Sequence, residues 1–374
     1  MKFKINREFF SAGLSQVVNI VSNRPTLPVF SNVLIQAEEG KVKLTTTNLE
    51  IGILCLVKAD VVVPGSITLP VKKLKDIVGG LMGSEISVEL FSGNKVKITS
   101  GSSDALMSGI ETEQFPPLPV VSDGNLFEIE QGELATMIKS VSYAQSTDEN
   151  RYVLNGVFFN FTEDGLVLVA TDGRRLATCE RKIAPVSEKI KPFILPAKTV
   201  NELQKQLGSK GKVSIGLSER QVMFEIDAED KAESGLCDKI RIVSKVVEGN
   251  YPQYRQVIPK DSGNRLEVER EMFLRSVDFA AKVTTDKNNS VHLNIAPNSL
   301  EVAANGGENE ASNKIAVQYE GPEMKIAFNP QFLSDPLKAL TQDIVVFEFK
   351  DELSPGVVKT KDEGFLCVIM PQRK

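Results

Sequence analysis

The chain repeats one pattern of apolar residues three times within its 374 residues. Each copy opens with a short alternating strand that begins at Phe3, Phe127 or Leu266. Apolar residues then recur 7, 11 and 14 positions after the opening residue. They are Phe10, Leu14 and Val17 in the first copy, Leu134, Ile138 and Val141 in the second, and Phe273, Val277 and Ala280 in the third. Spacings of four and three place side chains on one helix face, so each copy predicts a strand followed by an amphipathic helix.

The same order of elements continues downstream in every copy. Two short strands follow, joined by Gly-, Asn- or Asp-bearing turns near residues 38–40, 163–165 and 297–298. A second helix comes next, with apolar residues at offsets 0, 5 and 12. These are Leu69, Leu74 and Leu81, then Leu195, Val200 and Leu207, then Phe328, Leu333 and Leu340. Each copy is therefore predicted to be an α+β domain of two helices packed on antiparallel strands, built from two strand–helix–strands units.

Pro-bearing extended segments separate the copies. Residues 115–119 and 251–254 each stand just before a new copy, where proline prevents a helix from continuing. The period of roughly 125 residues is long enough for each copy to bury its own core. We therefore expect three similar domains, at residues 1–122, 123–253 and 254–374.

Composition argues against several classes of protein. The first ten residues are charged and lack the apolar core of a secretory signal, and no apolar run approaches membrane-span length, so we expect a cytoplasmic protein with no membrane partner. Cys55, Cys179, Cys237 and Cys367 are scattered singly, which favours reduced thiols over metal or redox chemistry. The one histidine, His292, has no nearby acid in the sequence to suggest a catalytic pair.

No motif for a reaction is present either. The glycines at 79, 80 and 83 close a predicted helix and do not link a strand to one, so they are no phosphate-binding loop. Acidic residues at 38–39 and 348–352 are best interpreted as solvated. We predict a protein that is not an enzyme and needs no metal or cofactor.

Charge is distributed unevenly between predicted helices and the rest of the chain. The net charge is −5, from 44 basic and 49 acidic residues. The helices predicted at residues 6–24, 71–82, 131–151, 196–213, 268–287 and 329–342 together carry +5, which leaves −10 elsewhere. Such a division suggests one surface suited to phosphates and another that repels them.

Five motifs carry a resemblance to a known family. They are Arg24-Pro25-Thr26-Leu27-Pro28 with residues 31–34, Arg151-Tyr152-Val153-Leu154-Asn155-Gly156, residues 170–177 (ATDGRRLA), Tyr251-Pro252-Gln253-Tyr254-Arg255 and Val368-Ile369-Met370-Pro371. In this order and at this spacing, the chain resembles the β sliding clamps of bacterial DNA polymerase III along its whole length.

The resemblance implies the DNA-clamp fold and a head-to-tail homodimer ring. Six domains would surround duplex DNA, with twelve helices lining the hole and sheets outside. Loose contacts with phosphates hold DNA without reading its sequence, which permits sliding. The residues expected to face DNA are Arg24, Arg151, Tyr152, Lys198 and Lys205.

The family also captures short peptides that contain Gln and Leu or Phe. The resemblance implies three kinds of partner: the DNA polymerase III α subunit, the clamp loader and other proteins that carry a clamp-binding motif. The expected pocket residues are Leu154, Thr171, Gly173, Arg174, Arg175, Leu176, Pro252, Val257, Pro355, Val368, Met370 and Pro371. The residues expected in the subunit contact are Ala105, Met107 and Val283.

Some positions depart from the common family pattern. The chain ends Gln372-Arg373-Lys374 where many relatives have apolar residues, which predicts a more polar rim of the pocket. Ala105 and Lys282 replace larger apolar residues, so the subunit contact is expected to depend more on strand pairing and ion pairs. Two rival functions stay open from the residues alone: an enzyme with an inter-domain cleft, and a repeat adaptor that binds peptides but never encircles DNA.

Overall fold

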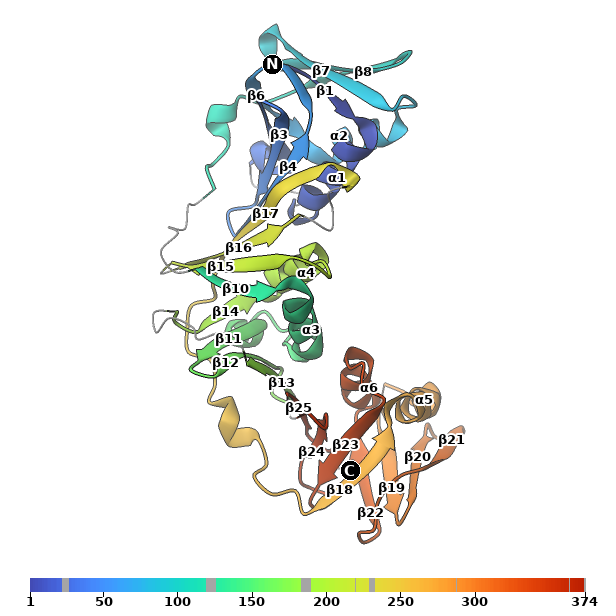
Figure 1. Ribbon diagram of the computed structural model, residues 1–374. Helices are drawn as coiled ribbons and strands as arrows, with labels where there is room; N and C mark the ends of the chain where they lie inside the picture. Colours follow the sequence, from blue (N-terminus) through green and yellow to red (C-terminus); the bar gives the residue numbers. More distant parts are fainter. Residues whose placement is uncertain are drawn as a thin grey trace. The chain divides into compact units, whose positions relative to one another are not determined.

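The computed structural model describes residues 1–21, 27–118, 126–182, 190–218, 220–228, 233–286, 288–362 and 364–372. The chain forms two compact units (Figure 1). The first unit comprises Met1–Ala135 and Asn201–Val246, and the second comprises Thr136–Val200 and Val247–Lys374. Among the described residues, no helix has the length and apolar character needed to cross a bilayer.

The order of elements repeats three times, as the sequence pattern predicts. The first copy contains β1 (Lys2–Asn6), α1 (Arg7–Val17), β2 (Asn32–Glu38), β3 (Lys41–Thr47), β4 (Ile51–Lys58), β5 (Asp60–Val63), β6 (Gly65–Pro70), α2 (Val71–Gly80), β7 (Glu85–Phe91), β8 (Lys95–Ser100) and β9 (Ser103–Ser108). Apart from β5, this is a strand, a helix and three strands, repeated twice.

The second and third copies follow the same plan without an extra strand. The second contains β10 (Leu126–Glu130), α3 (Gln131–Val141), β11 (Gly156–Thr162), β12 (Gly165–Thr171), β13 (Arg175–Lys182), β14 (Phe193–Pro196), α4 (Ala197–Gln206), β15 (Lys212–Leu217), β16 (Gln221–Asp227) and β17 (Leu236–Lys245). The third contains β18 (Asn264–Glu269), α5 (Arg270–Ala280), β19 (Val291–Ala296), β20 (Ser299–Asn305), β21 (Glu310–Ala316), β22 (Met324–Phe328), α6 (Pro330–Ala339), β23 (Ile344–Phe349), β24 (Gly356–Lys359) and β25 (Phe365–Ile369).

The apolar residues that define the repeat form the cores. Phe10, Leu14 and Val17 of α1 are buried, as are their counterparts in α3 and α5. Helix α1 lies close against β4, because a Cβ on Gly13 would stand 2.4 Å from Val57 Cγ2. Only glycine permits this approach without displacing the side chains of Val57 and Leu44.

The helices are shorter than predicted, which weakens the charge division. The side chain of Asn6 caps α1 by accepting hydrogen bonds from the N–H groups of Glu8 and Phe9, and the α-helix ends at Val17. Helix α4 ends at Gln206, so the lysines at 210 and 212 belong to a turn and to β15. With these bounds α2 carries +2, α4 carries +1 and the other four helices are neutral. The predicted helical charge of +5 was therefore too high.

Each unit contains two antiparallel sheets (Figure 1). The first unit has a five-stranded sheet in the order β5-β1-β7-β8-β9 and an eight-stranded sheet in the order β10-β15-β16-β17-β4-β3-β2-β6. The second unit has an eight-stranded sheet in the order β14-β11-β12-β13-β25-β24-β23-β18 and a four-stranded sheet in the order β21-β20-β19-β22. Strands from neighbouring copies thus pair inside the two large sheets, β4 with β17 and β13 with β25.

Candidate peptide-binding site and nucleic-acid surface

An apolar cluster lies on one face of the large sheet of the second unit. Its buried members are Val167, Val169, Leu176, Tyr254 and Val368, and Phe158, Tyr251, Ile258 and Leu366 pack against them. Of these residues, only Leu176 and Val368 were expected in the pocket from the sequence. The other cluster residues were not expected there. Alternating apolar residues in β11 and β12 indicate that one face of the sheet is buried, but not which segment packs on that face.

Strand pairing brings together two of the predicted pocket residues. Leu176 on β13 lies opposite Val368 on β25, although they are far apart in the sequence. Beyond the strand, the N–H of Met370 donates to the carbonyl oxygen of Arg174 at 3.0 Å. This bond fixes the C-terminal segment beside the turn that precedes β13.

The segment before β18 forms one wall of the site. The ring of Tyr251 stacks on Phe158 with centroids 4.7 Å apart, and Tyr254 meets the same ring edge-on at 6.4 Å. Val257 follows them and remains 57% exposed, as Met370 does at 46%. A buried aromatic base with exposed aliphatic groups at its margin suits an apolar ligand.

The turn at residues 171–175 is held by its own side chains. Thr171 Oγ1 donates to the carbonyl of Arg175 at 2.6 Å and accepts from the N–H of Gly173 at 3.1 Å. Asp172 Oδ1 accepts from the N–H groups of Arg174 and Arg175, at 2.8 and 3.0 Å. Gly173 adopts a φ of +86°, which glycine allows without strain.

The side chain of Arg175, one of the expected pocket residues, is held inside the protein. It is only 8% exposed, and its guanidinium bonds Asp172 and Asp335. Arg174, by contrast, is exposed. Adjacent positions at the start of a strand point to opposite faces, which places the side chains of Arg174 and Arg175 differently. The role of Arg175 in the pocket stays a prediction.

The remaining predicted pocket residues lie at the margins. Pro252 is exposed, whereas Leu154, Pro355 and Pro371 are half-buried. Pro355 and Val257 both line a hollow of about 410 Å³ beside residues 256–262. These four positions are compatible with contacts to a bound segment, and their role stays a prediction.

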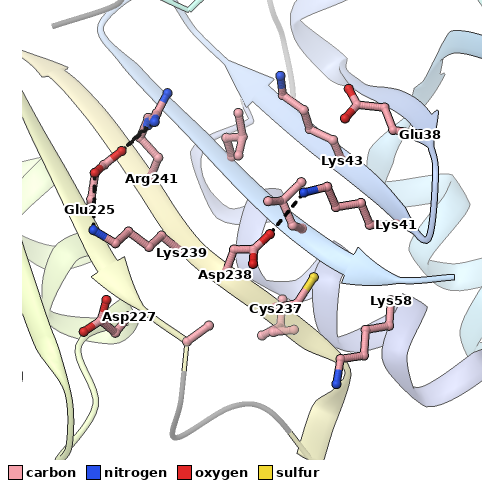
Figure 2. A pocket seen from close by; sticks show the side chains of 14 residues that line it. Glu38, Lys41, Lys43, Lys58, Glu225, Asp227, Cys237, Asp238, Lys239 and Arg241 are labelled. Atoms are coloured by element: carbon pink, nitrogen blue, oxygen red, sulfur yellow. Dashed lines mark hydrogen bonds and ion pairs between the residues drawn. The ribbon is translucent and has the colours of Figure 1, made fainter. Parts of the chain in front are cut away.

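A larger hollow, of about 840 Å³, lies on β3, β4, β16 and β17 of the first unit (Figure 2). Lys41 Nζ bonds Asp238 at 3.2 Å, while Lys239 and Arg241 both reach Glu225. Burial raises the pKa of the Cys237 thiol at its floor. Three of its basic residues are thus paired with acidic ones and its thiol is protonated, which gives this hollow no evident chemistry.

Three family models match successive parts of the chain. They describe the N-terminal, central and C-terminal domains of the DNA polymerase III β subunit and match residues 1–119, 128–253 and 255–373. The β sliding clamp of Escherichia coli strain K12 is 32% identical over 378 residues, which cover 100% of both chains. That of Chlamydia pneumoniae is 30% identical over 376 residues, covering 100% of this chain and 99% of the relative.

Solved structures agree with the sequence relatives. A sliding clamp from Bartonella birtlesii bound to griselimycin is 31% identical, with a TM-score of 0.92 and complete coverage of both chains. The Bacillus subtilis sliding clamp is 28% identical, with a TM-score of 0.93, and the match covers 100% of this chain and 99% of that one. The chain belongs to the β sliding clamp family of DNA polymerase III. It is a DNA sliding clamp built from three clamp domains.

The residues predicted to face DNA are mostly exposed in this sliding clamp. Lys198 on α4 is exposed, and Tyr152 is too. Lys205 Nζ lies 3.3 Å from Glu202, which offsets part of its charge. Arg151 donates to the carbonyl of Asp172 at 3.2 Å and therefore also touches the pocket turn. Arg24 lies outside the described residues.

The predicted subunit-contact residues differ in their accessibility. Ala105 on β9 and Val283, in the short helix Ala281–Val283, are half-buried. Met107 is only 4% exposed within the single chain, and its place in the subunit contact stays a prediction. Leu106, between the two, is 65% exposed.

In the described part of this clamp, no group of three or more His, Cys, Asp or Glu side chains is placed to hold a metal ion. Burial raises the pKa of the Cys367 thiol to about 12, so this thiol stays protonated at neutral pH.

Proposed function

We propose that two copies of this clamp close head to tail into a ring that encircles duplex DNA and tethers the replicative polymerase in the cytoplasm. The ring supplies no catalytic step of its own. The three family matches support a division into domains at residues 1–122, 123–253 and 254–374. The observation that carries the proposal is a pair of complementary unpaired strand edges.

The two junctions inside the chain use the same pairing. In each junction, the strand that closes the first half of one copy pairs with the last strand of the next copy. The pairs are β4 with β17, and β13 with β25. Two strands in these positions remain, β21 of the third copy and β9 of the first. Among the described residues each pairs on one side only, with β20 and β8. Pairing β21 with β9 of a second chain would complete the series.

The internal junctions also predict the register of this contact. Counting across the paired strands from the first strand of each copy leads to Ala105 in the first copy, Ile242 in the second and Cys367 in the third. These three residues therefore occupy equivalent positions. In the same way, Ala311 holds the place of Ile53 and Ala177. Ile53 lies opposite Ile242, and Ala177 lies opposite Cys367. We therefore infer that Ala311 of one chain lies opposite Ala105 of the other.

Closure by two chains fits DNA better than closure by one. A ring of one chain would have six helices around its hole. With helix axes about 10 Å apart, that hole would be roughly one helix diameter wide, ~10 Å. This hole would be narrower than the major groove of DNA, which is about 12 Å wide, so a whole duplex could not pass through it. Two chains double the perimeter, and two heterologous contacts related by a twofold axis close it.

Positive helices would hold the DNA without reading its sequence. Helices α2 and α4 carry the net positive charge of the six. Arg24, Arg151, Tyr152, Lys198 and Lys205 are the proposed contacts. Contacts of Lys and Arg with phosphates give affinity that does not depend on sequence, whereas specific base contacts would stop sliding.

The apolar cluster of the second unit would bind the polymerase α subunit, the clamp loader and other proteins through a short peptide with Gln and Leu or Phe. Val257 and Met370 at its margin are exposed and aliphatic or thioether in character. A flexible thioether can pack against different side chains, which suits a site with several partners.

A topological experiment tests the proposal. We expect the purified protein, once loaded, to stay on nicked circular DNA through gel filtration and to slide off after the same DNA is cut once. A ring has this dependence on topology because it is not bound to any sequence. Equal retention on circular and linear DNA would contradict encirclement, and a peptide-binding protein with no retention on either would favour the adaptor alternative.

A further inference from the structure

Arg175 is the most heavily engaged charged residue near the peptide-binding site. Its Nε lies 3.1 Å from Asp172 Oδ2, its Nη1 lies 2.6 Å from Asp335 Oδ2, and its Nη2 donates to the carbonyl of Tyr143 at 2.6 Å. The guanidinium carbon also lies 4.6 Å from the ring centroid of Phe332. Every edge of the guanidinium is used inside the protein, so little of it is available to a peptide.

These partners come from two different copies of the repeat. Asp172 and Tyr143 belong to the second copy, whereas Phe332 and Asp335 lie on α6 of the third. Both carboxylates are four-fifths buried. One buried arginine therefore ties the turn at residues 171–175 to a helix of the next copy.

The first junction of the chain shows that the turn does not need this arginine. The turn at residues 47–51 has the same bonds: Thr47 Oγ1 donates to the carbonyl of Ile51, and Asn48 Oδ1 accepts from the N–H groups of Glu50 and Ile51. Ile51, buried, stands in the place of Arg175. The arginine thus serves the connection to α6 and not the local fold of the turn.

The tied turn in turn places both sides of the peptide-binding site. The carbonyl of Arg174 accepts the N–H of Met370, and the next residue along β13, Leu176, is part of the buried floor opposite Val368. A shift of the turn would therefore move the exposed Met370 and the floor together.

We propose that Arg175 and Asp335 form a latch that holds the peptide-binding site in its binding shape. Arg175 is a positioning residue in this account and makes no contact with the peptide. The inference rests on the proposed capture of peptides for its functional meaning. Its physical content, that Asp335 restrains the turn at residues 171–175, stands independently of any ligand.

The test compares Asp335→Asn with Asp278→Asn in the full-length protein. Asp335→Asn keeps the size of the side chain and removes the charge, so one buried partner of Arg175 is lost. Asp278→Asn is the matched control. It breaks an exposed ion pair of 3.2 Å between Asp278 and Lys338, and Lys338 lies on α6, the helix that carries Asp335. A labelled synthetic peptide of the Gln-x-x-Leu-Phe type serves as probe, and its dissociation constant is measured by titration.

We expect Asp335→Asn to bind this peptide at least about tenfold more weakly and the control to bind like the parent protein. Arg175→Met should lose a similar factor, and the double variant should be no weaker than either single variant, because both remove one latch. Asp335→Glu, which keeps the carboxylate, should recover most of the affinity. Full affinity in Asp335→Asn with loss only in Arg175→Met would show a direct contact by Arg175 and overturn the latch.

Hydrogen exchange without peptide separates the latch from the proposed function. We expect faster exchange in Asp335→Asn at residues 171–176 and 368–370, with unchanged exchange in the core strands of the first unit. Phe332→Leu, which removes only the ring beside the guanidinium, should give a smaller change in the same segments. Unchanged exchange at residues 171–176 would refute the latch, whereas failure of the parent protein to bind peptide would count against peptide capture alone.

Discussion

Gly173 occupies a backbone conformation that all three copies of the repeat adopt at the same place. Its φ is +86°, that of Leu49 is +72° and that of Gly307 is +100°. The turn thus has a residue with positive φ in each copy. In the first copy this residue is Leu49, so a residue larger than glycine can adopt this φ. At the peptide-binding site glycine removes that strain and leaves the turn without a side chain.

We expect Gly173→Ala to destabilise the protein by about 1 kcal/mol, because an L-residue is strained at positive φ. The added Cβ would lie 3.2 Å from Arg151 Nη1, the far end of a flexible side chain that can move aside. Thermal unfolding checks the stability, and titration with the synthetic peptide checks the affinity, which should fall several-fold.

Gly307→Ala is the matched control for this variant. Its φ is also positive, nothing lies within 4 Å of the added Cβ, and it is remote from the apolar cluster in sequence and sheet. It should cost similar stability and leave peptide affinity unchanged. If both variants weakened the peptide equally, Gly173 would have no special place in the site.

At the scale of elements, the proposed pairing of β9 with β21 of a second chain predicts which residues lie opposite one another. The Arg174–Met370 bond marks a hydrogen-bonded pair, so Ala177 and Cys367, three positions along, form a pair without direct hydrogen bonds. Such pairs have Cα atoms about 4.5 Å apart, which is within the range that a disulfide spans. Ala311 and Ala105 of a second chain are the equivalent pair.

We expect a chain carrying Ala105→Cys, mixed with one carrying Ala311→Cys, to form a disulfide-linked dimer under mild oxidation. Each variant alone should not form it, because the contact joins two different surfaces. Non-reducing electrophoresis measures the product. The native Cys55, Cys179 and Cys367 are buried, whereas Cys237 is half-buried, so the disulfide product of the parent protein measures the background.

Ser312→Cys in place of Ala311→Cys is the control for register, because neighbouring residues of a strand point to opposite faces. Efficient cross-linking through Ser312 with Ala105 would show that the register is shifted by one residue. Self-linking of either single variant would show a symmetric contact instead of a head-to-tail one.

At the scale of the whole molecule, a protein with net negative charge needs a positive surface where it meets the phosphates of DNA. The chain carries −5, yet α2 and α4 carry +2 and +1. Exposed Lys73 on α2 and Lys198 on α4 lie away from the buried faces of their helices. Because phosphate contacts release counterions, each lost contact reduces the dependence of binding on salt.

We expect Lys73→Ala combined with Lys198→Ala to weaken DNA retention and to lower the slope of log affinity against log salt by about 2 per chain. Retention on circular DNA at several salt concentrations measures the slope. Lys97→Ala with Lys325→Ala removes the same charge from strands β8 and β22 and should leave the slope unchanged. An unaltered slope in the helix variant would remove α2 and α4 from the DNA-facing surface.

Local pattern predicted the alternation of strands and helices in each copy, but not the strands β4, β13 and β21 that follow each predicted pair. Spacings of four and three residues report helix faces, and Phe10, Leu14 and their counterparts are buried as that spacing requires. Helix ends were less predictable. The first helix was predicted to run to residue 24, but α1 ends at Val17, where a short tighter helix begins. The amino-acid order therefore determined three α+β copies and most of the motif positions.

Tertiary structure alone decided which distant residues meet. Leu176 and Val368 pair through strands from different copies, and Arg175 was expected in the pocket but is buried against Asp335 of α6. The physical reason is range: periodicity follows from bonds between near neighbours, whereas a strand edge can pair with any exposed edge of matching length. The three repeats were legible in the sequence, and the strand pairings that join them in the large sheets appeared only in the folded chain.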